Sequence, residues 1–348
     1  MSTQSNQELI NASMAFLAYA GESLAVSSNT VFETAQLFDK ILPTYPHLNN
    51  DWQVVWGPAL HLTDEIIMKK QANLTYVAQS RSTPSSYIVS TRGTVSDNIW
   101  EWLSQDLAVD FLAWPTPEST AITPYVSKAT ADALSVVLKT IPPTDTPFGF
   151  KPLPGAGQSL ASFLAGLTGF GPIEICFAGH SLGGAIASAL ALWFKQAQGK
   201  AQIPNNKIFN PMPAWDVKAD ATIACVSLAE ATPGDTVFSQ YFEELIGPNF
   251  DRIFNTHDVV PHGFDELKQL PSLYAPDIAL EELEKLALEG FEAKVLIVEK
   301  KINSKFAVLP NANPFTCPIN MAHASYASQA LYQHIDAYEQ QFGLPDNF

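Results

Sequence analysis

The chain has 348 residues, 47% of them hydrophobic and 16% charged, which is enough apolar material for the core of one large α/β domain spanning residues 1–348. The formal net charge is −16, and the 19 lysines and arginines form no basic cluster, which argues against a nucleic-acid partner. No run reaches the roughly 18 apolar residues of a transmembrane segment. The three cysteines have neither metal-site spacing nor the pattern of a disulfide framework.

The first eight residues contain no lysine or arginine, so they lack the basic start of a usual signal peptide. We therefore expect a cytoplasmic protein, or one exported by a non-standard route. Amphipathic patterns predict helices over residues 9–20 and 30–38, which should cover one face of a sheet. The alternating β-branched run at 86–91 predicts a strand that ends in Arg92-Gly93-Thr94.

The middle of the chain continues this alternation of helix and strand. Residues 126–140 have helical spacing, 141–157 are rich in Pro, Gly and Thr and predict a loop, and 159–167 predict a short helix. Gly155-Ala156-Gly157 lacks the third glycine and the preceding strand of a dinucleotide-binding loop. We therefore expect no nucleotide cofactor, and no metal.

Residues 179–184 read Gly-His-Ser-Leu-Gly-Gly between a short apolar run at 172–178 and an Ala/Leu-rich run at 184–194. The first run predicts a buried strand and the second a helix. Strand, Gly-x-Ser-x-Gly and helix form a nucleophile elbow, in which the serine has a strained backbone and its hydroxyl stands clear of the sheet. The pattern predicts Ser181 as a nucleophile.

The last third adds further predicted elements. They are strands at 222–228 and 252–255, helices at 238–245, 276–287 (with Gly290 past its end) and 324–341, and a hairpin of 295–298 with 306–309. Strands alternate with helices along the chain, which predicts an α/β fold whose mostly parallel sheet is covered on both faces.

A serine hydroxyl needs a general base, and that base needs a carboxylate to fix its tautomer. After a nucleophile elbow the acid comes next in the chain and the histidine last, which leaves His257, His262, His323 and His334. His257 and His262 flank the best acid candidate, Asp258, too closely. His334 falls inside a predicted helix, where we expect a surface residue. His323 follows a loop and precedes that helix, so it is the predicted base.

Asp258 is the predicted acid because it closes a strand, and such sheets place their chemistry at the carboxyl ends of strands. The alternative is Asp235, whose Thr-Pro-Gly-Asp setting is typical of a turn or a helix cap. A tetrahedral intermediate also needs N–H donors for its oxyanion. One is the residue after the nucleophile, Leu182, and the loop after an earlier strand points to Thr94 as the other.

These motifs, in this order, resemble the class 3 lipases of the filamentous-fungal type. The matching segments are Arg92-Gly93-Thr94, Gly179-His180-Ser181-Leu182-Gly183, Asp258-Val259-Val260-Pro261 and His323-Ala324-Ser325-Tyr326, within about residues 85–330. The resemblance implies an α/β-hydrolase fold, a triad of Ser181, Asp258 and His323, and Thr94 as oxyanion residue. Two features depart from the family: the serine–aspartate interval of 258 − 181 = 77 residues, with an apparent insertion at 202–221, and the absence of a His-x-Gly-Phe segment.

In that family a lid follows the oxyanion residue, which implies a lid at about residues 95–108. Ser96 or Asp97 can cap a short helix there, and Trp100 and Trp102 suit a boundary between water and lipid. The predicted activity is hydrolysis of acylglycerol esters through an acyl-enzyme. Phospholipase A1 or acyltransferase activity uses the same triad and is the alternative, and a non-catalytic lipid-binding protein is the alternative outside enzymes.

Overall fold

The computed structural model describes residues 4–63, 70–93, 109–116, 122–199 and 215–345. Its helices and 3₁₀ segments are α1 Asn6–Leu17, α2 Thr30–Ile41, η1 Leu42–Thr44, α4 Lys128–Lys139, α5 Leu160–Leu167, η3 Thr168–Phe170, α6 Leu182–Ala197, α7 Thr236–Ile246, η4 Gly247–Asn249, η5 Leu267–Ser272, α8 Glu282–Ile302, α9 Tyr326–His334 and α10 Asp336–Phe342. Its strands are β1 Trp52–Thr63, β2 Lys70–Ser80, β3 Ser86–Arg92, β4 Phe111–Ala113, β5 Tyr125–Ser127, β6 Glu174–His180, β7 Thr222–Leu228, β8 Gly234–Asp235, β9 Phe250–Asn255, β10 Phe306–Ala307 and β11 Ala312–Phe315.

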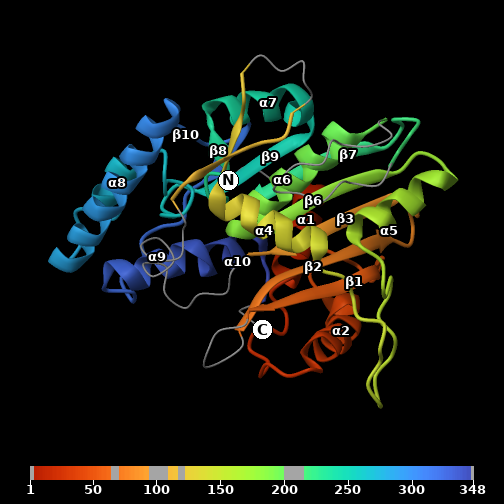
Figure 1. Cartoon of the computed structure of the whole chain (residues 1–348). Helices are drawn as coiled ribbons and strands as arrows, with labels where there is room; N and C mark the ends of the chain where they lie inside the picture. Colours follow the sequence, from red (N-terminus) through yellow and green to blue (C-terminus); the bar gives the residue numbers. More distant parts are fainter. Residues whose placement is uncertain (1–3, 64–69, 94–108, 117–121, 200–214, 346–348) are drawn as a thin grey trace.

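The main sheet has seven strands in the order β1-β2-β3-β6-β7-β9-β11. The pairs from β3 to β11 are parallel, whereas β1, β2 and β3 form an antiparallel meander at one edge (Figure 1). A four-stranded sheet, β10-β8-β5-β4, lies beside it. The mostly parallel sheet with helices around it is the α/β-hydrolase architecture, which confirms the predicted fold class.

Each face of the main sheet has its own apolar core, because strand side chains alternate between the two faces. Tyr76 and Ile88 point to the face that α1, α2 and α10 cover, and Val77 and Val89 point to the face that α4 and α6 cover. In Figure 1, α4 crosses in front of the sheet and α1 lies behind it. Both cores share one sheet, which fits the single domain expected for residues 1–348; that domain assignment stays a prediction.

Most predicted elements are confirmed, including β3, β6, β7, β9 and the helices α1, α2, α5, α6 and α7. α1 begins with a capping box, in which Ser5 Oγ accepts from the amide of Glu8 and Ser5 N donates to the Glu8 carboxylate. The long strands β1 and β2 are an addition to the predicted elements. Their register shifts, and the Gly57-Pro58 pair within β1, interrupt the alternation by which a strand is recognised.

The predicted helix 276–287 is helical only from Glu282, and its predicted end is wrong, as is the hairpin that begins at 295–298. A single helix, α8, covers Glu282–Ile302 and continues through Gly290, and Phe306–Ala307 pairs with β8 instead. A helical glycine costs about 1 kcal/mol relative to alanine. A capping box at Glu281 and Glu284 and a buried apolar face offset that cost.

The predicted final helix, 324–341, is divided in two. Ile335 has φ −119° and ψ −74°, which ends α9 at His334 and starts α10 at Asp336. His334, the last residue of α9, lies directly before this break and is buried. In the part of the chain that the structure describes, no helix combines the length and the apolar content needed to cross a membrane.

Candidate active site

Ser181 occupies the tight turn between β6 and α6, as the sequence predicts. Its backbone has φ 61° and ψ −134°, a conformation that non-glycine residues rarely adopt, and strain of this kind is typical of the serine in a nucleophile elbow. The amide of Ser181 donates to Leu228 O at 2.9 Å, and Ser181 O accepts from Gly184 N at 2.9 Å. These bonds tie the turn to the carboxyl end of β7 and to the first turn of α6.

Two glycines of the motif are required by close backbone contacts. A Cβ at Gly179 would lie 2.1 Å from Gly183 O, and a Cβ at Gly183 would lie 2.4 Å from Thr91 O. Side chains at either position would therefore push the helix off the sheet. The elbow depends on these glycines for its shape.

The strand end that leads to Thr94 lies directly on the elbow. A Cβ at Gly93 would approach Leu182 Cβ to 2.8 Å and Gly183 N to 2.7 Å. Leu182 opens α6, so its amide is among those at a helix N-terminus, where N–H groups favour negative charge. Thr94 itself and the predicted lid at 95–108 lie outside the described residues.

Asp258 lies three residues beyond the end of β9 and is fully buried. Its carboxylate accepts from His334 Nδ1 at 2.9 Å, from Tyr338 Oη at 2.9 Å and from Val260 N at 3.0 Å. Burial and the charge of Asp258 raise the pKa of Tyr338 well above its usual value, so its hydroxyl keeps the proton that it donates. The carboxylate is thus held on three sides.

Asp235, the alternative acid, has a structural role. It is the N-cap of α7 and accepts from Phe238 N at 2.8 Å, from Tyr125 N at 3.0 Å and from Ser304 Oγ at 2.6 Å. These bonds join α7, the small sheet and the end of α8. The helix-cap interpretation of Asp235 is confirmed.

The histidine beside Asp258 is His334, not His323, which corrects the expected pairing. His334 is the last residue of α9 and only 6% exposed, so the expectation of a surface residue is wrong. Because the carboxylate only accepts, His334 Nδ1 carries the proton and Nε2 is left as an acceptor. The ring of His323 instead stacks on Tyr332, with centroids 4.8 Å apart.

The burial of polar side chains in α9 explains this error. Gln333 and His334 have the polar character of a solvent-facing turn, but Gln333 bonds Asn255 and His334 bonds Asp258. The spacing of His334 and Tyr338, four residues apart, held a clue, because both tips converge on one carboxylate. That clue becomes readable only once the partner carboxylate is known.

His180 and Tyr19 are site residues that the sequence reasoning missed. His180 Nε2 lies 2.8 Å from His334 O, and since a carbonyl only accepts, Nε2 carries the proton. Tyr19 Oη lies 3.2 Å from His180 Nδ1 and 3.1 Å from His180 O. Burial and the neighbouring His334 hold the pKa of His180 well below its usual value, so its ring is neutral. This contact joins the residue before Ser181 to the histidine that binds Asp258.

The remaining histidines of this region bond elsewhere. His257 Nδ1 lies 2.7 Å from Cys317 O, and His262 Nδ1 lies 2.6 Å from Glu266 Oε2. Within the ranges that the structure describes, no three His, Cys, Asp or Glu side chains form a metal-binding group.

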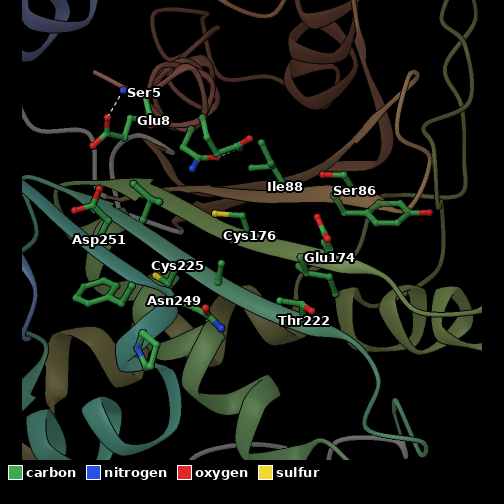
Figure 2. Close-up of a pocket in the computed structure, with 18 residues that line it drawn as sticks. Ser5, Glu8, Ser86, Ile88, Glu174, Cys176, Thr222, Cys225, Asn249 and Asp251 are labelled. Carbon is green, nitrogen blue, oxygen red and sulfur yellow. Dashed lines mark hydrogen bonds between the residues drawn. The ribbon is translucent and has the colours of Figure 1, made fainter. Parts of the chain in front are cut away.

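A cavity of about 460 Å³ opens at the amino-terminal ends of the central parallel strands (Figure 2). Its lining includes Ser86, Glu174 and Thr222, the first residues of β3, β6 and β7, and the Glu8–Asp251 pair. Ser181 follows the opposite end of β6, five residues beyond Cys176, the last residue of that strand in the cavity lining, which is about 16 Å along an extended strand. The cavity is therefore not part of the Ser181 site.

Comparison with solved structures finds lipases with a similar fold. Over its whole length the chain is similar to the crystal structure of M37 lipase, with a TM-score of 0.80, 24% identity, and coverage of 98% of this chain and 93% of that one. Lipases from Rhizopus microsporus var. chinensis (16% identity, 74% of this chain and 68% of that chain) and Rhizomucor miehei (17% identity, 75% and 63%) align with a TM-score of 0.45 each. A search of curated protein sequences gave no match.

The family model described as Lipase (class 3) matches residues 88–267, a span of 267 − 88 + 1 = 180 residues and more than half of the chain. That span contains the elbow, the strand that ends at Arg92 and the buried Asp258. Members of this family are lipase-type serine ester hydrolases that act on lipid or ester substrates. The chain belongs to the class 3 lipase family.

Proposed function

We propose that this protein hydrolyses acylglycerol esters through a triad of Ser181, His334 and Asp258. The observation that carries the proposal is the bond from His334 Nδ1 to Asp258, at 2.9 Å, beside the strained elbow of Ser181. A buried carboxylate that fixes one histidine tautomer leaves the opposite ring nitrogen to act as a base. Among the residues that the structure describes, His323 has no carboxylate partner, and it is left out of the proposed triad.

The reaction has two stages, in which His334 moves one proton. Nε2 takes the proton of the Ser181 hydroxyl while Oγ bonds the ester carbonyl carbon, and returns it to the departing alcohol as the C–O bond breaks. In the second stage, His334 Nε2 takes a proton from water as the water oxygen bonds the acyl carbon, and returns it to Ser181 Oγ as the ester bond of the acyl-enzyme breaks. The fatty acid is released and Ser181 is free again. Asp258 stabilises the imidazolium in each stage without taking the proton itself.

The oxyanion needs donors that are in place before the reaction. The amide of Leu182, at the start of α6, supplies one, and the packing of Gly93 on the elbow supports Thr94 as the other. Replacing Thr94 by valine removes its hydroxyl and keeps its shape. If that hydroxyl donates, turnover should fall by about 10²-fold with little change in KM; an unchanged turnover would leave only backbone donors.

Acylglycerols are the proposed substrates because the family acts on lipid esters and the predicted lid at 95–108 is rich in tryptophan. The lid remains part of the proposal. Phospholipids are the alternative substrate, and acyl transfer to an alcohol the alternative reaction. Both would use the same acyl-enzyme.

The test begins with covalent labelling by a fluorophosphonate, which needs an activated serine. We expect labelling of the native protein, none of Ser181→Ala, and strongly slowed labelling of His334→Ala, with His323→Ala as the matched control. An unlabelled native protein would refute the proposed triad and favour the alternative of a non-catalytic lipid-binding protein. Product analysis on triolein emulsion, phosphatidylcholine vesicles and an added alcohol then separates the lipase, phospholipase and acyltransferase activities.

A further inference from the structure

Helix α8 carries two apolar stripes on different sides. The inner stripe is buried in the main core and consists of Leu288, Phe291, Val295 and Val298. The outer stripe is exposed to solvent and consists of Leu283, Leu286, Gly290, Ala293 and Ile297. Figure 1 shows α8 at the left margin of the molecule, with one long side facing away from it.

The outer stripe leaves its large side chains open. Leu283 is 78% exposed, Leu286 63% and Ile297 66%. Within the described part of the chain, a Cβ placed on Gly290 would have no neighbour within 4 Å. Single exposed leucines are common on protein surfaces, whereas a continuous exposed row along a helix indicates an interaction surface.

The spacing of the outer stripe is that of a helix-pairing seam. Successive members are 3, 4, 3 and 4 residues apart, which is the a/d pattern of a coiled coil over two heptads. The large residues occupy the ends, and Gly290 and Ala293 occupy the centre. Small residues at a crossing point let two helix backbones approach closely, while Leu286 and Ile297 fill the space on either side.

Charges beside the outer stripe differ between the two halves of the helix. Glu289 and Glu282, whose carboxylate also pairs with Lys285 of the same helix at 2.7 Å, flank its N-terminal half. Lys294, Lys300 and Lys301 flank its C-terminal half. An antiparallel copy of the same helix would set the acidic half of each against the basic half of the other. It would also oppose the two helix dipoles, whereas a parallel copy would align them.

A lipid surface fits this stripe less well. The central residues of the outer stripe, Gly290 and Ala293, would bury little apolar area in a lipid surface, but they permit close packing of two helices. Acidic residues border it, whereas helices that lie on membranes favour lysine and arginine on their polar side.

We propose that the outer stripe of α8 binds the same stripe of a second copy of this chain, in an antiparallel arrangement with twofold symmetry. In the a-to-d layers of such a pair, Leu286 faces Ile297 of the other copy and Gly290 faces Ala293. One helix from each copy gives an interface below the usual size for a stable complex, so the dimer is expected to dissociate at about 10 μM.

Sedimentation equilibrium of the full-length protein tests the proposal directly. The native chain should approach the dimer mass at concentrations above about 100 μM. Gly290→Arg places a charged side chain in the seam and should raise the dissociation constant at least 10-fold. Gly166→Arg is the matched control, because Gly166 also lies exposed in a helix, and no described atom lies within 4 Å of its Cβ position.

Cysteine cross-linking tests the orientation. Positions 286 and 297 are 297 − 286 = 11 residues apart, about 16 Å along one helix and far beyond the 7 Å limit for a disulfide within a chain. The doubly substituted Leu286→Cys/Ile297→Cys protein should therefore cross-link between copies on mild oxidation. Either single variant, and the native chain with Cys176, Cys225 and Cys317, should not.

Four results would overturn the proposal. In sedimentation, they are a native protein that stays monomeric at 200 μM and a dimer that Gly290→Arg leaves intact. In cross-linking, they are a double-cysteine variant that forms no cross-links and single variants that do, because cross-linked single variants would mean that the two helices are parallel. A monomer that floats with neutral phospholipid vesicles, and loses flotation with Gly290→Arg, would assign the stripe to lipid instead. None of these readouts depends on esterase activity.

Discussion

Replacing His334 by alanine is the most decisive perturbation of the proposed triad. The substitution removes the proposed base and one of the three donors to the buried carboxylate of Asp258. Triad members act as a unit, so kcat should fall by about 10⁴-fold or more, and kcat/KM with it. A drop of 10⁴ corresponds to about 5.5 kcal/mol of transition-state stabilisation.

The same substitution has a smaller effect on folding. Val260 N and Tyr338 Oη still donate to Asp258, so the carboxylate keeps two of its three donors. Losing one hydrogen bond to a charged group costs about 2 kcal/mol, which lowers the melting temperature but leaves a folded protein at 25 °C. Activity and stability therefore separate.

The assay measures initial rates on a water-soluble short-chain nitrophenyl ester, with circular dichroism melting on the same samples. His323→Ala is the control, because that ring stacks on Tyr332 away from Asp258, and its rate should stay within about twofold of native. The reasoning is refuted if His323→Ala loses three or more orders of magnitude while His334→Ala remains active.

Three further substitutions test the site and its surroundings. Gly183→Ala places a Cβ 2.4 Å from Thr91 O and should lower the free energy of unfolding, measured by urea titration, by about 3 kcal/mol. Gly166→Ala is the control, because its Cβ would lie in open space and should not destabilise the fold. Equal stabilities of the two variants would contradict the close packing of the elbow. Tyr19→Phe removes the hydroxyl from His180 and should lower kcat about tenfold at constant KM; an unchanged kcat would deny Tyr19 a positioning role. Burial raises the pKa of the Glu230 carboxyl from its ordinary 4.5 to about 7 in the folded protein. The unfolded chain therefore loses this proton at lower pH than the folded protein does. The free energy of unfolding should fall as pH rises from 4.5 to 7, by about 3 kcal/mol in total. Glu230→Gln should remove that part of the pH dependence of the unfolding free energy, and an unaltered pH profile would place the ionisation elsewhere.

The local sequence around Ser181 was sufficient to predict its conformation. An apolar run, Gly-x-Ser-x-Gly and an Ala/Leu-rich run specify strand, turn and helix within about 25 residues, and only glycine fits where β6 and α6 touch. The strand that ends at Arg92 and the proposed acid that follows β9, Asp258, were readable for the same reason. Each depends on short-range hydrophobic periodicity and on the end of one strand.

α8 shows where local signals mislead. Gly290 and the β-branched run that follows it suggested a helix end and a hairpin, but the inner stripe of α8 packs into the core along the whole helix. Burial of four large side chains outweighs about 1 kcal/mol of glycine propensity. Propensity gave the wrong boundary because the deciding contacts come from distant parts of the chain.

The sequence by itself determined the α/β class and the strained turn at Ser181, and it selected Asp258 as the proposed acid, because those features arise from neighbouring residues and the end of one strand. Only the tertiary structure decided which histidine meets Asp258. His323 and His334 are 11 residues apart, and both suit a base by chain order. The break at Ile335 and the burial of the end of α9 bring His334 to the carboxylate, and no local pattern encodes a contact between residues 76 positions apart.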